Sequence, residues 1–315
     1  MLERRRAMSN PRLHEIISRA LKKRENLQDG RTDLIRLIDG EGDDLRDIIL
    51  ESYGDGWLIS TSGPGLNPEL RNEIANYGKP LYWKRLDQHQ KESPVHLSGE
   101  KLPEFFTGLE NGLKCRLSFE SGYSQGIFID QRDNRDALRK MVKPGQTVLN
   151  TFAYTGFFSI AAAAAGAITS TLDLSQVYLD WARENFRLNG MTPEDHYFCK
   201  GDTFHWLRRF AKQSRTFDYI ILDPPTFSRD DKGKVFRVEK DYGRLFDLAA
   251  ACLAPGGKIL ACTNFRGMST REFMKQLKGA RLEPVEMPED FTDTPYLKSI
   301  WASFDLSPIA PRENP

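Results

Sequence analysis

The sequence has 315 residues, which is the length of about two domains. Hydrophobic residues make up 39% and charged residues 28%, which excludes a disordered or fibrous protein. Lys and Arg number 45 against 44 Asp and Glu, so the net charge of +1 shows no overall basic excess for a nucleic-acid partner.

The charge is unevenly distributed along the chain. Residues 1–25 carry a net charge of +5, so the other 290 residues sum to −4. Apolar residues from Leu13 to Leu21 recur at helical spacing and predict a basic amphipathic helix in an arm of residues 1–28. This arm is either a solvated surface helix packed on the protein or a contact for nucleic acid.

The compartment, and whether the protein enters a membrane, are predicted from motifs that the sequence does not contain. The longest run of small apolar residues, Phe157–Ala167, is shorter than the ~20 residues that span a bilayer, and no secretion signal is visible. The four cysteines are widely separated without a CxxC pair, which fits a reducing compartment. We expect a cytoplasmic protein with no membrane segment and no metal site.

Residues 29–125 have the pattern of a small α+β domain. Short strands are predicted at 34–38, 47–50 and 57–61, separated by glycine- and aspartate-rich turns, with a helix at 68–77. Segments 113–119 and 126–129 read as a hairpin around residues 120–124. No catalytic constellation occurs in this part of the chain.

Residues 126–315 alternate between strands and helices, which predicts an α/β domain with a mostly parallel sheet covered on both faces. Seven strands are expected, the last two pairing antiparallel at the edge: 147–152, 168–173, 196–201, 219–223, 258–264, 281–287 and 298–304. Ligands of such sheets bind outside the carboxyl ends of the strands.

The ends of the first three strands favour a ligand without phosphates. The loop from Asn150 to Gly156 has one glycine, whereas a dinucleotide site needs three, and no Walker A lysine occurs. Asp173 ends the second strand at the spacing of a ribose-binding acid, with Ser175 as N-cap of the next helix, or is itself only a turn residue. Asp202, beside Phe204, reads either as an adenine contact or as an ordinary Gly-Asp turn.

The strongest local motif follows the fourth strand. Asp223-Pro224-Pro225-Thr226-Phe227 ends a buried strand with an acid, and two prolines then stop the hydrogen-bonded ladder. The carbonyls there become fixed acceptors for an amino or imino group, and Phe227 is available to stack on a base.

These motifs together resemble the class I S-adenosylmethionine-dependent methyltransferases, and more narrowly the bacterial 23S ribosomal RNA large-subunit enzymes that modify cytosine C5 or guanine N7. Five further segments carry the resemblance over residues 32–306: 40–45, 53–55, 126–135, 182–190 and 296–298. The small RNA-binding domain that such enzymes often carry at the N-terminus is missing, and the basic arm stands in its place.

The resemblance implies a Rossmann-like sheet, S-adenosyl-L-methionine (SAM) as cofactor and a role for each matching residue. Asp223 to Phe227 would form the floor where methyl donor and acceptor meet. The cofactor would contact the following: Gln131, Arg132 and Arg135 at its methionine end, Asn150, Phe152, Tyr154, Thr155 and Gly156 in the first loop, Asp173 and Ser175 at the ribose, and Asp202, Thr203 and Phe204 at the adenine.

The acceptor atom depends on whether a thiol reaches the site, because cytosine C5 is not nucleophilic until a thiolate attacks C6. Cys262 lies two residues before the expected position, which Asn264 occupies, so we interpret Cys262 as a core residue. Asn264 can donate and accept toward a base. A base nitrogen is therefore predicted, with guanine N7 favoured over adenine N6.

Alternatives that stay open are a cytosine-C5 enzyme, a small-molecule or protein methyltransferase on the same fold, and a catalytically silent RNA-binding relative. The expected partner is large-subunit ribosomal RNA, and whether the protein forms a homodimer is left undetermined.

Overall fold

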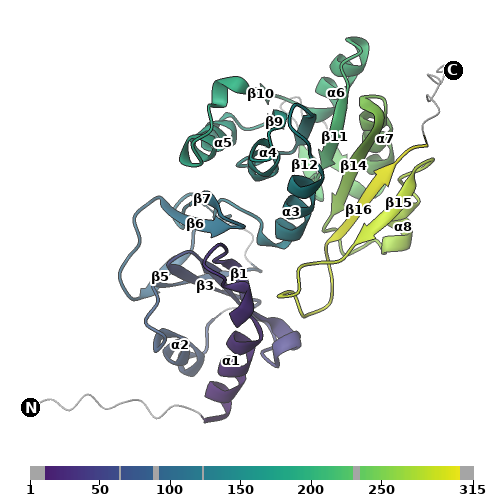
Figure 1. Ribbon diagram of the computed structural model, residues 1–315. Helices are drawn as coiled ribbons and strands as arrows, with labels where there is room; N and C mark the ends of the chain where they lie inside the picture. Colours follow the sequence, from purple (N-terminus) through teal and green to yellow (C-terminus); the bar gives the residue numbers. More distant parts are fainter. Residues whose placement is uncertain (1–10, 64, 88–91, 123, 230–234, 306–315) are drawn as a thin grey trace, which may run out of the picture. The chain divides into compact units, whose positions relative to one another are not determined.

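The computed structural model describes residues 11–63, 65–87, 92–122, 124–229 and 235–305 (Figure 1). The chain divides into two compact units, each considered by itself below. Unit 1 comprises residues 1–129 together with 288–295, and unit 2 comprises residues 130–287 together with 296–315. The sequence pattern gave no indication that residues 288–295 belong to the first unit.

Unit 1 is built on a five-stranded sheet whose order follows the chain: β1 (Leu34–Asp39), β2 (Ile48–Tyr53), β3 (Gly56–Thr61), β4 (Leu81–Arg85) and β5 (Val95–Ser98). β3 and β4 pair in parallel because helix α2 (Pro68–Ala75) connects them, and the other neighbours are antiparallel. Ile17 and Ala20 of helix α1 (Pro11–Lys23) share one hydrophobic core with this sheet and α2. The predicted strands at 34–38, 47–50 and 57–61 and the helix at 68–77 are confirmed.

The predicted hairpin of residues 113–119 with 126–129 is wrong. β7 (Leu113–Leu117) pairs instead with β6 (Phe106–Glu110), and residues 126–128 form no strand before the short 3-10 helix Ile129–Gln131. Asn111 and Gly112 join the two strands with φ of +51° and +79°. An Asn-Gly pair with both residues at positive φ forms a tight two-residue hairpin turn, and that motif decides the pairing.

The predicted helix of the basic arm is confirmed as α1, but several of the arm's positive charges form ion pairs within unit 1. Arg19 pairs with Asp44, and Lys23 lies 2.9 Å from Asp43. Arg24, just after the helix, is 2% exposed and contacts both oxygens of Asp43 at 2.7 and 2.8 Å. The arm residues at positions 1–10 lie outside the described part of the chain. The helix is therefore held on the rest of unit 1 by two of its own basic side chains and by Arg24, which follows it.

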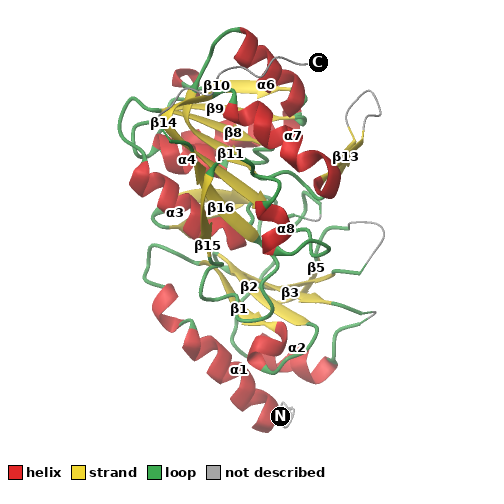
Figure 2. Ribbon diagram, turned by 90° about the vertical axis from the view of Figure 1, so that its right-hand side faces the viewer, coloured by secondary structure: helices red, strands yellow, loops and turns green. Residues whose placement is uncertain are grey.

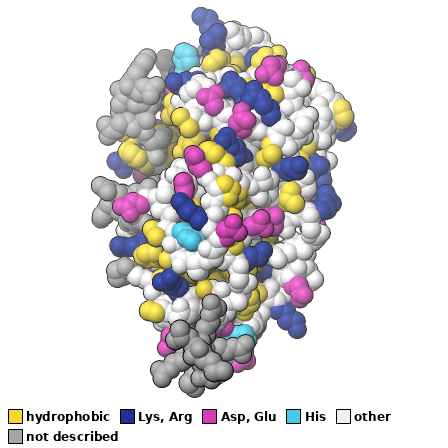
Figure 3. Space-filling model, turned by 90° about the vertical axis from the view of Figure 1, so that its left-hand side faces the viewer, with side chains coloured by type: hydrophobic (Ala, Val, Ile, Leu, Met, Phe, Trp, Pro, Cys, Tyr) yellow, Lys and Arg dark blue, Asp and Glu magenta, His cyan; other side chains and the backbone are white. Residues whose placement is uncertain are grey.

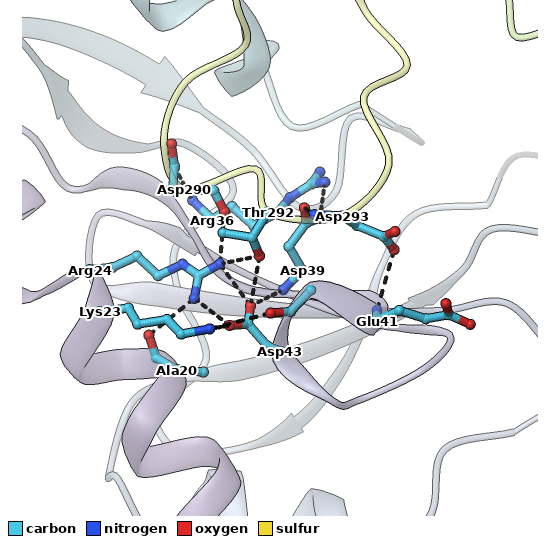
Figure 4. A network of polar contacts seen from close by, with 11 residues as sticks. Ala20, Lys23, Arg24, Arg36, Asp39, Glu41, Asp43, Asp290, Thr292 and Asp293 are labelled. Carbon is cyan, nitrogen blue, oxygen red and sulfur yellow. Dashed lines mark hydrogen bonds and ion pairs between the residues drawn. The ribbon is translucent and has the colours of Figure 1, made fainter.

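The loop of residues 288–295 completes this network (Figure 4). Arg24 donates to the carbonyl oxygen of Asp290 at 2.9 Å, and the Asp290 carboxylate accepts from the backbone N–H of Arg36 at 2.8 Å. The backbone N–H of Asp293 donates to Asp39 at 2.8 Å. Buried charges of this kind are stable only when each is paired, so unit 1 depends on residues that lie some 250 positions later in the chain.

Unit 2 contains the predicted seven-stranded sheet, and the α/β fold class is confirmed. Its order is β10 (Tyr197–Lys200), β9 (Ile168–Asp173), β8 (Thr147–Thr151), β11 (Phe217–Leu222), β14 (Leu253–Thr263), β16 (Lys298–Ser303) and β15 (Arg281–Val285). Six of these strands run in one direction, and β16 is antiparallel to both of its neighbours. A small antiparallel pair that was not expected, β12 (Phe227–Arg229) with β13 (Val235–Arg237), follows β11.

Helices cover both faces of this sheet (Figure 2). α3 (Arg132–Met141) and α4 (Phe157–Ala163) share a core with one face, and α6 (Thr203–Lys212) and α7 (Val238–Ala250) share a core with the other. α5 (Gln176–Leu188) packs beside α4 and β9, and the short α8 (Thr270–Met274) lies near β16. None of the described helices is long and apolar enough to cross a membrane.

Candidate active site

The carboxyl ends of β8, β9, β11 and β14 lie at one edge of the unit 2 sheet. The parallel register aligns Thr151 with Leu172 on one side and with Leu222 on the other, and Leu222 with Ala261. The residues that follow these positions are therefore brought together, although they are separated by up to about a hundred residues in sequence. This edge collects most of the predicted site residues.

The loop after β8 is held in an unusual backbone conformation. Phe152 and Tyr154 have φ of +51° and +50°, which side-chain-bearing residues adopt only at a cost of about 1–3 kcal/mol each. Gly156 follows with φ of +79°, and a Cβ there would lie 2.7 Å from that of Ala182. Asn185 of α5 secures the loop by donating to the carbonyl oxygen of Thr155 at 3.0 Å. Strain concentrated in a short loop at a sheet edge is typical of a functional site.

Asp173 is oriented by backbone donors at the end of β9. One carboxylate oxygen accepts from the N–H of Tyr154 at 2.9 Å, and the other accepts from the N–H of Ser175 at 2.8 Å. Burial raises the pKa of this carboxyl, against the lowering effect of these hydrogen bonds. The ring of Tyr178 lies 4.6 Å from that of Tyr154, beside the acid. Ser175 caps α5 as predicted. A carboxylate accepts about four hydrogen bonds, so at least one position beyond the backbone donors is left for a hydroxyl.

The three residues predicted to contact the adenine, and Asn150 of the first loop, differ in burial and in hydrogen-bond partners. Asp202 caps α6 by accepting from the N–H of His205 at 2.8 Å, and Thr203, the first residue of that helix, is buried. Phe204 is 7% exposed and packs 5.9 Å from the ring of Phe236. Asn150 is likewise buried, and its amide donates to Ser159 of α4 at 3.0 Å. Asn150 and Phe204 therefore support the site from within the core, and their predicted cofactor contacts stay predictions.

Asp223 is the acid at this edge whose pKa departs most from its ordinary value. Burial, together with the nearby charge of Asp130, raises its pKa to about 7, although a hydrogen bond from Gln131 and the charge of Arg135 act in the opposite direction. The Gln131 side-chain nitrogen donates to its carboxylate at 2.9 Å. An acid that ionises near neutral pH at a sheet edge is a strong candidate for a functional group.

Gln131 is itself oriented by a buried polar chain. The Asn134 amide donates to the Gln131 side-chain oxygen at 2.6 Å and to the hydroxyl of Ser299 at 2.8 Å. Because the oxygen of Gln131 is thus occupied, its NH₂ group is turned toward Asp223. The thiol of Cys262 lies 3.5 Å from the Ser299 hydroxyl and 3.9 Å from the Gln131 side-chain oxygen, next to these hydrogen-bonded side chains. Cys262 is fully buried, as predicted.

Arg132 and Arg135 are both buried at the start of α3, next to Gln131. The Arg135 guanidinium lies 5.7 and 5.5 Å from the rings of Phe157 and Phe158, at the start of α4. Its positive charge also lowers the pKa of Asp223. The three residues predicted for the methionine end of the cofactor are therefore brought to the same region, and their contacts with it stay predictions.

The segment after β11 and the end of β14 complete the edge. Pro224 is buried, Pro225 is exposed, and the carbonyl oxygen of Thr226 accepts from the N–H of Val238 at 3.2 Å. Phe227 is 49% exposed, and the Arg237 guanidinium lies 5.6 Å from the centre of its ring. Asn264 is exposed immediately beyond β14.

Three polar residues of this site were not singled out from the sequence. Asp130 and Asn134 stand within the 126–135 segment that carried the resemblance, and Asp130 accepts from the hydroxyl of Tyr296 at 2.9 Å. Ser299 gave no sequence pattern, because only the pairing of β16 with β14 brings it opposite Cys262.

The chain is similar to known proteins over most of its length. Residues 76–296 match the family model of S-adenosylmethionine-dependent methyltransferases. The chain is 33% identical over 251 residues to a ribosomal RNA large subunit methyltransferase K of Neisseria meningitidis, covering 78% of this chain and 71% of that protein. It is 34% identical over 280 residues to a putative ribosomal RNA large subunit methyltransferase, YwbD, of Bacillus subtilis, covering 82% and 70%.

Solved structures give the same result. A putative methyltransferase crystallised with SAH matches with a TM-score of 0.86 and 29% identity, over 94% of this chain and 82% of that one. A putative SAM-dependent methyltransferase from Streptococcus mutans matches with a TM-score of 0.82 and 28% identity, over the same shares of the two chains. The chain therefore belongs to the S-adenosylmethionine-dependent methyltransferase family, and SAM is its cofactor.

Proposed function

We propose that this enzyme methylates a base nitrogen of large-subunit ribosomal RNA, and that guanine N7 is the acceptor. The names of the curated relatives support the RNA class. The single observation that carries the choice of atom is the absence of an accessible thiol: all four cysteines of the sequence are buried.

Cys262 is the cysteine nearest to the acceptor edge, and it is a poor nucleophile. Its side chain is fully buried, and burial together with the charge of Asp223 raises its pKa well above the ordinary value for a thiol. Transfer to cytosine C5 requires a thiolate that reaches C6 of the base. A base nitrogen needs no such attack, because its lone pair is already available.

The residues at this edge suit the cofactor. Asp173 offers carboxylate oxygens to a ribose, the loop after β8 has no glycine-rich phosphate cradle, and Asp223 supplies a negative charge. SAM, when bound, supplies a methyl group on a positively charged sulfur. An ionised Asp223 stabilises positive charge at this place, and the buried Arg135 opposes it, so the balance between the two sets the local field.

The acceptor base would be held by groups of opposite hydrogen-bonding character. The Asn264 amide donates toward an acceptor such as guanine O6, and the carbonyls around Pro224 and Pro225 accept from a base N–H. Phe227 offers a face for stacking. The N7 lone pair would form the new N–C bond while the bond between the methyl carbon and the donor sulfur breaks, so the base would gain the positive charge that the donor loses. Positioning and charge stabilisation suffice, since no proton has to be removed.

Digestion of large-subunit RNA after reaction with labelled methyl donor tests the proposal. Recovery of 7-methylguanosine supports it, and the Cys262→Ala variant should then retain activity within about threefold. Recovery of 5-methylcytosine, lost in Cys262→Ala, would replace guanine N7 by cytosine C5. Label in the amino nitrogen of adenine would move the proposal to that atom. Label in protein or small molecules alone would overturn the RNA class.

A further inference from the structure

We propose that Arg266 and Lys298 form a phosphate-binding pair beside Asn264, which holds the backbone of the RNA next to the nucleotide being methylated. This inference rests on the proposed RNA substrate and adds the place where that substrate is gripped. The two cations lie close to Asn264, no acid in the described part of the chain pairs with them, and two carbonyl oxygens anchor Lys298.

Both cations lie at the acceptor end of the unit 2 sheet. Lys298 begins β16 directly opposite Thr263, the last residue of β14, and Asn264 and Arg266 follow that residue. The Arg266 guanidinium lies 5.0 Å from the ring of Tyr296, and the Lys298 ammonium lies 3.2 Å from the carbonyl oxygen of the same tyrosine. Tyr296 thus contacts both cations close to the strand end that Asn264 follows.

Within the part of the chain that the structure describes, neither cation has a carboxylate partner. Lys298 makes its hydrogen bonds to two carbonyl oxygens, at 3.0 Å for Phe265 and 3.2 Å for Tyr296, and Arg266 contacts only the tyrosine ring. Burial, and then the charge of Arg266, lower the pKa of Lys298. Two cations that repel each other without an acid between them favour the binding of an anion.

The anchoring of Lys298 points to a built site. Its two carbonyl contacts hold the ammonium in place and leave one of its three N–H donors for a ligand. The contact with Phe265 also fixes the turn that carries Asn264. A phosphodiester at this pair and a base at Asn264 are neighbours in one nucleotide chain, which matches the division between phosphate contacts that position and base contacts that specify.

Other surfaces offer less. On the face drawn in Figure 3, Lys and Arg side chains are interspersed with Asp and Glu, so no broad field of one sign stands out among the side chains shown. Three basic residues at the end of the N-terminal arm are paired within unit 1. The cations beside Asn264 differ from both, because acids do not neutralise them and they adjoin the acceptor position.

The test measures the affinity for protein-free large-subunit ribosomal RNA, transcribed in vitro, as a function of salt concentration. For Arg266→Gln we expect the slope of log affinity against log salt to fall by about 0.7–0.9, the value for one lost phosphate contact. Lys298→Gln should have an effect of the same size, and Arg266→Lys should keep the wild-type slope. The affinity of both glutamine variants for SAM should not change.

Matched controls remove the same charge elsewhere. Arg281→Gln removes an exposed arginine at the start of β15, opposite Ser303 at the end of β16, and Lys212→Gln removes an exposed lysine at the end of α6. Both should keep the wild-type slope. Since Arg266 is exposed, its variant remains informative even if Lys298→Gln does not fold.

Three outcomes would count against these ideas in different ways. An unchanged slope for Arg266→Gln, while wild type binds and methylates the RNA, overturns the phosphate pair alone. A loss of SAM affinity in this variant, with the slope unchanged, assigns the pair to the cofactor carboxylate instead. Failure of the wild type to bind or methylate ribosomal RNA overturns the proposed function, and the inference with it.

Discussion

Replacing Asp223 by Asn should make the protein more stable and less active at the same time. Burial raises the pKa of Asp223 from an ordinary value of 3.8 to about 7. Below 3.8 the carboxyl is protonated in both the folded and the unfolded state, so it costs nothing. Between the two values the folded state holds a proton that the unfolded state has lost, and the free energy of unfolding therefore falls as the pH rises. Above about 7 the loss is complete.

The magnitude follows from the two pKa values. Each pH unit between them is worth about 1.4 kcal/mol, so ionisation of Asp223 lowers the free energy of unfolding by about 4 kcal/mol at pH 8, and by about 1.6 kcal/mol at pH 5. Asn cannot ionise and still accepts the hydrogen bond from Gln131. The advantage of Asp223→Asn should thus grow by about 2–3 kcal/mol from pH 5 to pH 8, or roughly 4–12 °C in the melting temperature.

The assay is thermal and denaturant unfolding of wild type and variant at both pH values, without cofactor. Asp247→Asn, an exposed position on α7, is the matched control and should show no difference that depends on pH. Methyl transfer by Asp223→Asn should fall about 10²–10³-fold, because a charge aimed at the reacting centre is lost. A pH-independent stability difference would refute the reasoning about burial. Full activity of the variant would remove Asp223 from the site.

Three further predictions use other parts of the molecule. Gly156→Ala should lower the free energy of unfolding by about 3 kcal/mol and weaken SAM binding, whereas Gly145→Ala, also at positive φ but in open space, should cost only about 1 kcal/mol in thermal unfolding. Asn134→Ala should reduce kcat about tenfold with little change in KM, because Gln131 loses the donor that orients it. The pH profile of activity should shift as well, and an unchanged profile would make Asn134 merely structural. Arg24→Met should lower the unfolding free energy by about 1–3 kcal/mol, since the buried Asp43 loses its two-pronged partner and keeps only Lys23 as a cation; reduced RNA affinity at unchanged stability would contradict this.

The patterns that could be predicted from the sequence are local ones. Alternation of strands and helices fixes a covered parallel sheet, and the acids after three strands, Asp173, Asp202 and Asp223, fall at the sheet edge because every parallel strand ends on the same side. The burial of Cys262 followed from its distance to that edge. The pairing of β6 with β7 is also encoded locally, since Asn111-Gly112 is itself the turn, and this pattern excludes the predicted hairpin.

Tertiary structure decided what depends on distant pairs. Residues 1–25 of the basic arm carry a net charge of +5, yet part of this charge is neutralised within unit 1. Asp43 and residues 288–295 come into contact with the arm only in the folded protein. Ser299 reaches the polar chain behind Asp223 only through the antiparallel register of β16. The sequence by itself determined the fold class, the cofactor class and which strand ends carry the acids. Folding decided which charges are neutralised, since desolvation and pairing depend on neighbours far away in the chain.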